Sequence, residues 1–338
     1  MARMEEEDKT YIAWGIGEGV HEATGLKPML TPEEQVDLLK TKGVTFERCD
    51  EEKAAEALTE RDTFLHIASY RKLFQTFQGG KSDGLYVGLD FADLVYLDEL
   101  DHKVRQAFLM ASQDVERLAR VKLMNRAMEH QEDGYSIVAE FMESQQKRYR
   151  NAIESDLRRR MGLGVDGDEY SGDLIRRYAK AMPLWVFLEV VTFGTLLALY
   201  LFCAERWQNA EMREEHYILK GVKSLRNCCS HGSCILNGFD SRSDSDYALS
   251  SVVYAWLAEL GMGNSRTRRA KLRNRRMQQL VEALVMLDKM DDAGKCVDTR
   301  AEMTTLRESL DEAAGHYGVQ HSFVSYLRFL SALIDRAV

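Results

Sequence analysis

Proline is almost absent from this chain, and its placement leaves long stretches in which helices can run without interruption. The 338 residues contain three prolines, Pro28, Pro32 and Pro183. Proline removes a backbone hydrogen-bond donor and clashes with the preceding turn, so its absence permits long helices. Fifteen methionines and few β-branched runs favour helices as well. We therefore predict an all-α fold, a multi-helix bundle, and we exclude a mainly β protein.

Composition and cysteine usage indicate the class of protein. Hydrophobic residues make up 45% of the chain and charged residues 29%, which is typical of a globular protein and argues against general disorder. The six cysteines include the adjacent pair Cys228 and Cys229, which does not fit a disulfide framework. The N-terminus is acidic and lacks the apolar core of a secretory signal. These features predict a cytoplasmic protein in a reducing compartment.

The spacing of apolar residues and of helix-end signals divides the chain into three parts. Residues 1–26 contain closely spaced glycines, so we expect a flexible leader. Residues 27–240 form a helical domain that starts at the capping box Thr31-Pro-Glu-Glu34, and residues 241–338 add helices packed on the same core. Helices are expected near residues 31–43, 51–58, 64–77, 90–130, once between 133 and 172, at 183–203, before Gly232, and at 248–260, 268–290, 300–314 and 322–337.

The most apolar stretch runs from Pro183 to Cys203 and is almost long enough to span a bilayer. Glu189 lies inside it, and a carboxylate in the middle of a membrane span is unfavourable by roughly 2–3 kcal/mol. A helix that is apolar on all sides is buried either in a protein core or in a membrane. We interpret this stretch as one helix of the protein core and expect no contact with a membrane.

Basic residues are concentrated although the formal net charge of the chain is −9. Between Ser265 and Gln278 there is no acidic residue, and the seven cations are Arg266, Arg268, Arg269, Lys271, Arg273, Arg275 and Arg276. On a continuous helix, four of these arginines follow 3-4-3 spacing and form one stripe. A local cationic segment on an acidic protein predicts binding to an anionic partner such as RNA. The alternative is a solvated helix face, and a second basic run lies at residues 146–150 and 158–160.

Arg226, Asn227 and His231 end a predicted helix that Gly232 stops. Asn227 and His231 are separated by four residues and share a helix face, and the long Arg226 side chain can reach the same place. An imidazole moves protons near neutral pH, and a guanidinium holds phosphate oxygens as charge builds, which is what phosphodiester cleavage requires. The alternative is a structural helix end. Tetrahedral zinc spacing is absent around Cys228, so we predict no metal site.

Several segments, in this order along the chain, resemble the Abi-like family of abortive-infection proteins of the AbiD/AbiF type, within the HEPN superfamily. The most recognisable segment is Pro183-Leu-Trp-Val-Phe-Leu-Glu-Val-Val-Thr-Phe-Gly-Thr195. The Arg226-Asn-Cys-Cys-Ser-His231 element is similar to the family's Arg-Asn-x-x-x-His element. Further similar segments are residues 27–35, 67–74, 94–105 and 115–120, and Asn237. After His231 this chain has Gly-Ser-Cys-Ile-Leu236, where the family commonly has another histidine.

The resemblance implies an HEPN-like helical core and a metal-independent endoribonuclease that acts as an anti-phage effector. The implied reaction is attack of the ribose 2′-hydroxyl on the adjacent phosphorus, which leaves a cyclic phosphate. His231 would be the general acid or base, and Arg226 would stabilise the charged phosphorus centre. Asn227 would orient the pair or donate a hydrogen bond to the phosphate. The site would be completed across a homodimer, without a cofactor. The expected partners are RNA and an inhibitor or antitoxin that suppresses the ribonuclease activity in the uninfected cell.

A second class of function stays open, namely a non-catalytic RNA-binding or scaffold protein in which Arg226 and His231 contact phosphate only. Further charged or polar residues of the family segments lie on predicted apolar helices: Tyr70, Arg71, Asp101, Arg105, Glu116 and Glu189. Charged groups in such places usually pair, because an unpaired buried charge is unfavourable. We predict buried Arg–carboxylate pairs that hold the helix bearing Arg226; the alternative is that these residues line the RNA path.

Overall fold

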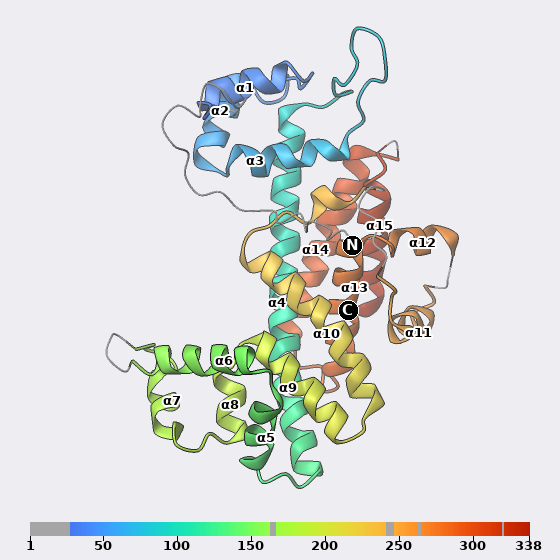
Figure 1. The fold of residues 1–338 in the computed structure, drawn as a ribbon. Coiled ribbons are helices and arrows are strands. Elements are labelled where there is room, and N and C mark those ends of the chain that lie inside the picture. Colours follow the sequence, from blue (N-terminus) through green and yellow to red (C-terminus); the bar gives the residue numbers. More distant parts are fainter. Residues whose placement is uncertain (1–27, 163–166, 241–246, 263–264, 320) are drawn as a thin grey trace, which may run out of the picture.

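A computed structural model describes residues 28–162, 167–240, 247–262, 265–319 and 321–338 (Figure 1). Within these ranges there are two isolated β-bridges and no β-strand, which confirms the all-α class. The leader predicted for residues 1–26 lies outside them. The helices are α1 (Pro32–Lys40), α2 (Glu51–Glu60), α3 (Phe64–Ile67), the 3₁₀ helix η1 (Ala68–Leu73), α4 (Phe91–Glu129), α5 (Ser136–Ser144), α6 (Lys147–Arg160), α7 (Gly172–Tyr178), α8 (Leu184–Val190), α9 (Phe193–Arg206), α10 (Ala210–Ser230), the 3₁₀ helix η2 (Leu236–Gly238), α11 (Ser251–Glu259), α12 (Arg266–Lys271), α13 (Arg275–Met290), α14 (Val297–Tyr317) and α15 (Val324–Ala337).

Helix α4 is the element around which the others are arranged. Its 39 residues span about 58 Å at 1.5 Å per residue. Asp90 and Asp93 form a capping box that satisfies its first backbone donors. Figure 1 shows α4 running most of the length of the molecule, with α1–α3 at one end and α5–α8 towards the other. Residues far apart along α4 therefore reach different parts of the structure.

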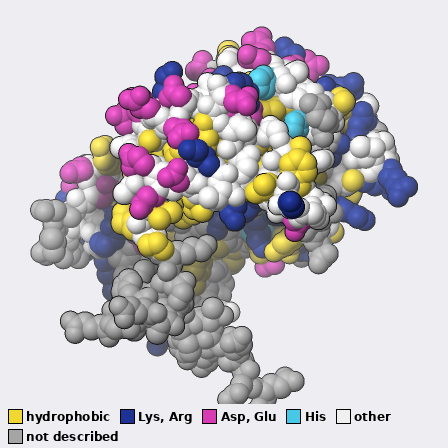
Figure 2. Space-filling model, turned by 90° about the horizontal axis from the view of Figure 1, so that it is seen from above, with side chains coloured by type: hydrophobic (Ala, Val, Ile, Leu, Met, Phe, Trp, Pro, Cys, Tyr) yellow, Lys and Arg dark blue, Asp and Glu magenta, His cyan; other side chains and the backbone are white. Residues whose placement is uncertain are grey.

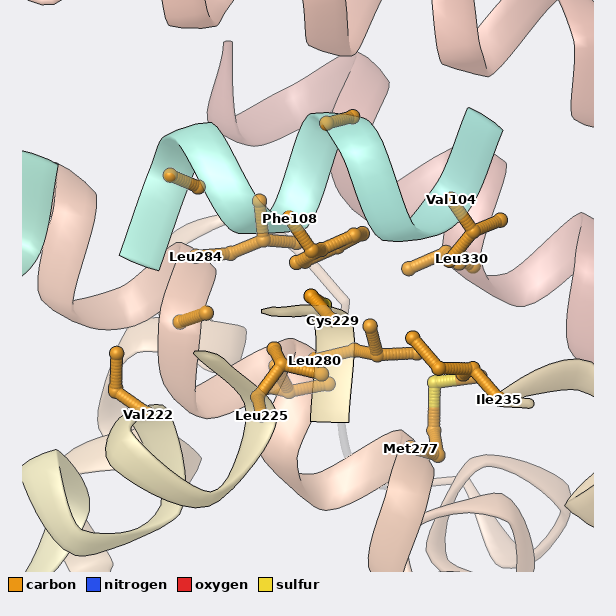
Figure 3. Packing of buried hydrophobic residues seen from close by; sticks show 14 of the residues in the cluster. Val104, Phe108, Val222, Leu225, Cys229, Ile235, Met277, Leu280, Leu284 and Leu330 are labelled. Atoms are coloured by element: carbon orange, nitrogen blue, oxygen red, sulfur yellow. The ribbon is translucent and has the colours of Figure 1, made fainter. Parts of the chain in front are cut away.

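One continuous cluster of buried apolar side chains joins α4, α9 and α10 to the C-terminal helices α13, α14 and α15. Figure 3 shows Phe108 of α4 between side chains of the facing helices, among them Leu225 and Cys229 of α10 and Leu280 and Leu284 of α13. Burial of this apolar area is the main stabilising contribution to the fold. The helices from α1 to η2 thus share buried contacts with the helices from α11 to α15, and α10 is packed against both α4 and α13.

The apolar stretch at 183–203 forms two helices, so the single helix that we predicted is wrong. Helix α8 ends at Val190, and Thr192 becomes the N-cap of α9, where its hydroxyl accepts a hydrogen bond from the Thr195 amide. The break is supported from α4, because Arg120 donates to the carbonyl oxygens of Leu188 at 2.8 Å and Val191 at 3.4 Å. None of the described helices is both long and apolar enough to cross a membrane.

Two other predicted elements differ from the structure. The helix expected at 64–77 is α3 followed by η1, and it ends where Phe74 becomes extended, with a bridge between Thr76 and Tyr86. This bridge is allowed by the turn at Gly79 and Gly80, both of which have positive φ, a region that glycine occupies without strain. The region 133–172 contains α5, α6 and the start of α7 rather than one helix.

Candidate active site

Helix α10 carries the predicted site residues on its last turn. Arg226 and Asn227 are half-buried, and His231 is the exposed C-cap. The His231 amide donates to the Asn227 carbonyl at 3.0 Å, and Gly232 has φ +67°, which ends the helix. Among the described residues, the His231 imidazole has no hydrogen-bond or ion-pair partner, so it faces solvent and is accessible to a ligand.

The Arg226 guanidinium is held from α4 and α9. Its Nη2 lies 3.3 Å from Oε2 of Glu116, and its Cζ lies 5.8 Å from the centre of the Phe193 ring. The second carboxylate oxygen of Glu116 accepts from Arg120 at 2.6 Å. Since Arg120 also binds the carbonyls at the α8–α9 break, the network links that break to α10. One carboxylate faces two guanidiniums, so the cluster keeps net positive charge, and Arg226 remains 28% exposed.

A second network fixes the chain that follows His231. Asp101 is fully buried, and its carboxylate accepts from the amides of Ile235 at 3.0 Å and Leu236 at 2.6 Å. It also accepts from the Tyr70 hydroxyl at 3.0 Å and from Arg105. Burial raises the pKa of the Asp101 carboxyl, whereas these four donors oppose that rise. Asp101 therefore ties the loop after His231 to α4.

The six charged or polar residues predicted to be buried on apolar helices differ in their burial and in their partners. Asp101 and Arg105 form one ion pair next to Tyr70, and Glu116 binds Arg226 itself. Arg71 donates to the Ala68 carbonyl at 2.7 Å and, among the described residues, has no carboxylate partner. Glu189 is exposed, contrary to the expectation of a buried side chain, because it faces away from the buried side of α8.

The predicted basic stripe does not exist as one helix face, because α12 ends at Lys271 and α13 begins at Arg275. The N-cap Asn274 causes the break: its side chain accepts from the amides of Arg276 and Met277 and donates to the Gly238 carbonyl at 2.6 Å. Arg276 points inward, donating to the carbonyls of Cys234 and Ile235, both at 2.9 Å, and to Asn237. Arg276 therefore supports the loop after His231.

The other cations of this segment differ in accessibility. Lys271 is buried beneath the Tyr326 ring, and burial lowers its pKa. Arg275 pairs with Glu282 at 3.2 Å. Arg266, Arg269 and Arg273 are exposed, and Arg268 is half-buried. In Figure 2, Asp and Glu side chains gather on the left, over α1 and α2. Lys and Arg side chains gather along the right edge, on the side where α12 lies in Figure 1. The accessible cations of this segment are thus fewer than the sequence indicates.

His66 was not among the residues predicted from the sequence, although Arg61 and His66 repeat the spacing of Arg226 and His231. Its Nε2 lies 3.2 Å from Oδ1 of Asp98 and 3.4 Å from Arg105, and the Tyr70 hydroxyl lies 3.3 Å away. His66 therefore belongs to the network around Asp101. The repeated spacing draws attention to His66, but its contacts with Asp98 and Arg105 are tertiary and cannot be predicted from that spacing.

Two groups of described side chains have metal-ligand chemistry, namely His66, Asp101 and Cys234, and Asp62, His66 and Asp98. The Arg105 guanidinium contacts both His66 and Asp101, and its positive charge opposes a cation there. Burial raises the pKa of the Cys234 thiol, whereas a metal requires the thiolate. We therefore interpret both groups as parts of the hydrogen-bond network.

Comparison with known protein families gives a match. The family described as Abi-like protein matches residues 58–237, slightly more than half of the chain. No curated protein and no solved structure matches significantly. The matched range contains Asp101, Glu116, Arg226 and His231, so both networks lie inside it. The chain belongs to the family of Abi-like proteins.

Proposed function

The family suggests a function in abortive infection, and we propose that this protein acts there as an HEPN-type, metal-independent endoribonuclease. The observation that carries the proposal is the end of α10, where a guanidinium fixed by Glu116 stays partly exposed and an accessible imidazole follows five residues later. A preorganised cation next to a proton-transfer group is suited to a reaction in which charge develops on phosphate oxygens.

In the proposed reaction, the ribose 2′-oxygen attacks the adjacent phosphorus and the 5′-oxygen of the next nucleotide leaves. One imidazole accepts the proton of the 2′-hydroxyl, and a second group donates a proton to the departing 5′-oxygen. Arg226 stabilises the negative charge on the phosphate oxygens, and Asn227 orients the substrate. A homodimer supplies two copies of His231, one as base and one as acid, if the two α10 ends face each other across the two-fold axis.

A non-catalytic RNA-binding protein is the alternative, and one observation favours it. The Glu116 carboxylate already compensates part of the positive charge of Arg226, so less of that charge is left to stabilise a transition state. In that case the same residues hold an RNA phosphate without cleaving it.

Incubation of the purified protein with RNA in EDTA separates the two functions. The proposal predicts cleavage by the wild type and none by His231→Ala, whose helical circular dichroism should be unchanged because the His231 side chain is exposed. A gel shift without cleavage would support the binding protein instead. Light scattering tests the assembly: a strictly monomeric protein that cleaves RNA would contradict the composite site.

A cellular test addresses the abortive-infection part of the proposal. Expression of the wild type should slow growth or block phage propagation, and Arg226→Ala and His231→Ala should abolish that effect. Variants that have lost their helical signal would point to a structural role for these two residues.

A further inference from the structure

A cavity of about 350 Å³ lies between α6, α9 and α10, next to the candidate active site. Its wall includes Tyr149 of α6, Thr192 and Gly194 at the start of α9, and Lys223 of α10. Arg226 follows Lys223 by three positions, and residues at this separation are neighbours on a helix surface. Since Arg226 lies over the ring of Phe193, which directly precedes Gly194, the cavity and the active-site arginine share the first turn of α9.

The charge of this cavity is positive. Lys223 is half-buried, and among the described residues no carboxylate pairs with its amino group. Asp156 also lines the cavity, but it is neutralised by Arg159 at 2.5 Å and Arg160 at 3.0 Å. A cation in a concave, partly desolvated place attracts anions more strongly than one on an open surface. Lys223 is therefore available to a negatively charged ligand.

The cavity is also open at Gly194. A side-chain carbon built on Gly194 would lie 3.7 Å from the Lys223 amino nitrogen and 3.7 Å from the Thr192 hydroxyl, so any larger side chain would fill the space in front of Lys223. On the other side, the Tyr149 hydroxyl donates to the Thr195 hydroxyl at 3.4 Å. The hydroxyl groups of Tyr149, Thr192 and Thr195 and the Lys223 ammonium group thus surround a space that stays open because position 194 has no side chain.

We propose that this cavity binds a phosphate of an RNA strand next to the phosphate held at Arg226, with Lys223 as the residue that positions it. Positions 223 and 226 are about 4.5 Å apart along the helix axis, so one strand can follow α10 from the cavity to Arg226. The claim that the bound strand is a substrate rests on the proposed function. The claim that the cavity binds phosphate does not depend on that function. Lys223 is a positioning residue because it lies one turn away from the reacting atoms.

The test compares Lys223→Gln with Lys220→Gln, a matched control on the same helix. The exposed Lys220 amino group lies over the Tyr217 ring at 5.8 Å and does not line the cavity. Binding of a fluorescent single-stranded uridine oligonucleotide is measured by anisotropy over a range of salt concentrations, with both changes made in His231→Ala so that the RNA stays intact. Lys223→Gln should weaken binding about fivefold and reduce the salt slope by about one unit, whereas Lys220→Gln should change neither.

Gly194→Asp provides a second variant that keeps the fold. Its Cβ meets only ordinary van der Waals contacts, and an acidic residue in the first turn stabilises a helix. The new carboxylate should repel phosphate, so RNA affinity should fall at least as much as in Lys223→Gln while the midpoint of thermal unfolding is maintained.

The outcomes separate this inference from the proposed ribonuclease. Weaker binding of Lys223→Gln and Gly194→Asp, with Lys220→Gln unchanged, supports the phosphate site even if the wild type cleaves no RNA. Equal affinities in Lys223→Gln and its parent overturn it, even if the wild type cleaves RNA. An equal loss in Lys220→Gln would show a general charge effect and would also overturn it, as would a protein that binds no RNA.

Discussion

Glu116 holds Arg226 at 3.3 Å with the carboxylate whose other oxygen binds Arg120 at 2.6 Å. A residue in the middle of the longest helix thereby fixes the guanidinium at the end of α10. It also links that guanidinium to the α8–α9 break, because Arg120 holds the carbonyls of Leu188 and Val191. The most recognisable family segment thus contributes to the site through two backbone carbonyls and the Phe193 ring, although its own carboxylate, Glu189, is exposed.

Replacement of Glu116 by Gln should lower the turnover number for RNA cleavage more than it raises KM. The neutral amide no longer holds two guanidiniums, so Arg226 is misplaced, and errors of about 1 Å in positioning reduce rates by about a hundredfold. Steady-state kinetics with an RNA oligonucleotide measures both parameters. Glu154→Gln is the control, since Glu154 pairs, among the described residues, only with the exposed Arg158. Equal kinetics in both variants would show that Glu116 does not act through Arg226.

Replacement of Asp101 by Ala should destabilise the protein by about 3–5 kcal/mol. The change leaves the buried Arg105 and two backbone amides without their acceptor, and removal of one partner of a buried ion pair has this magnitude. Urea unfolding followed by circular dichroism measures the loss. Asp173→Ala, at an exposed ion pair with Arg176, should change stability by less than about 0.5 kcal/mol. A similarly small change in the free energy of unfolding of Asp101→Ala would contradict the role of Asp101 in tying the loop after His231 to α4.

Gly221→Ala should destabilise the contact between α10 and α13. A Cβ at this position would lie 1.5 Å from Oε2 of Glu282, so the two helices or the Glu282 side chain must move. Overpacking typically costs about 1–3 kcal/mol, and here the buried Glu282 side chain has to leave its place beside Arg275, which outweighs the roughly 1 kcal/mol that alanine gains over glycine inside a helix. The double variant Gly221→Ala/Glu282→Ala should lose less stability than the sum of the two single variants, because the clash is removed. Strict additivity in thermal unfolding would contradict this packing.

The buried Glu282 should make stability depend on pH. Burial raises the pKa of the Glu282 carboxyl to about 7, and its Oε2 has no hydrogen-bond partner within the part of the chain that the structure describes. The folded state therefore binds this proton more tightly than the unfolded state, so the contribution of Glu282 to the free energy of unfolding should fall as pH rises from about 4.5 to about 7, by up to about 3 kcal/mol. In Glu282→Gln this decrease should be absent, and the variant should be more stable than the wild type at pH 8. A wild type and a variant with parallel stability profiles would contradict it.

The sequence predicted the helical class and most helix positions, because capping boxes such as Thr31 with Glu34 and the apolar period of α4 are local signals. It did not predict the break at Thr192 or the one at Asn274. In both cases a side-chain cap interrupts a segment whose composition favours one helix. The break at Thr192 is held by a hydrogen bond from Arg120 to the preceding carbonyl of Val191, and the break at Asn274 by a hydrogen bond from Asn274 to the Gly238 carbonyl.

The same distinction applies to the candidate site. The resemblance to the Abi-like family singles out Arg226, Asn227 and His231, and Gly232 marks the end of their helix, so their placement on the last turn of α10 required no tertiary information. The inward orientation of Arg276 and the participation of His66 depend on residues more than 30 positions away in the chain, so a local pattern cannot indicate them. For the basic segment, the sequence therefore predicted too many RNA-binding cations, because charge alone does not distinguish a residue that binds RNA from one that stabilises a loop.

The chemical identity of the cleaved RNA ends tests the central claim most directly. An RNA oligonucleotide is incubated in EDTA with the wild type, Arg226→Ala and His231→Ala, and the products are identified by mass spectrometry, beside an oligonucleotide with 2′-deoxyribose at the cleaved position. The account predicts 2′,3′-cyclic phosphate ends with the wild type alone, and no cleavage at the 2′-deoxy position. Products with 3′-hydroxyl and 5′-phosphate ends, or equal cleavage by His231→Ala, would contradict it.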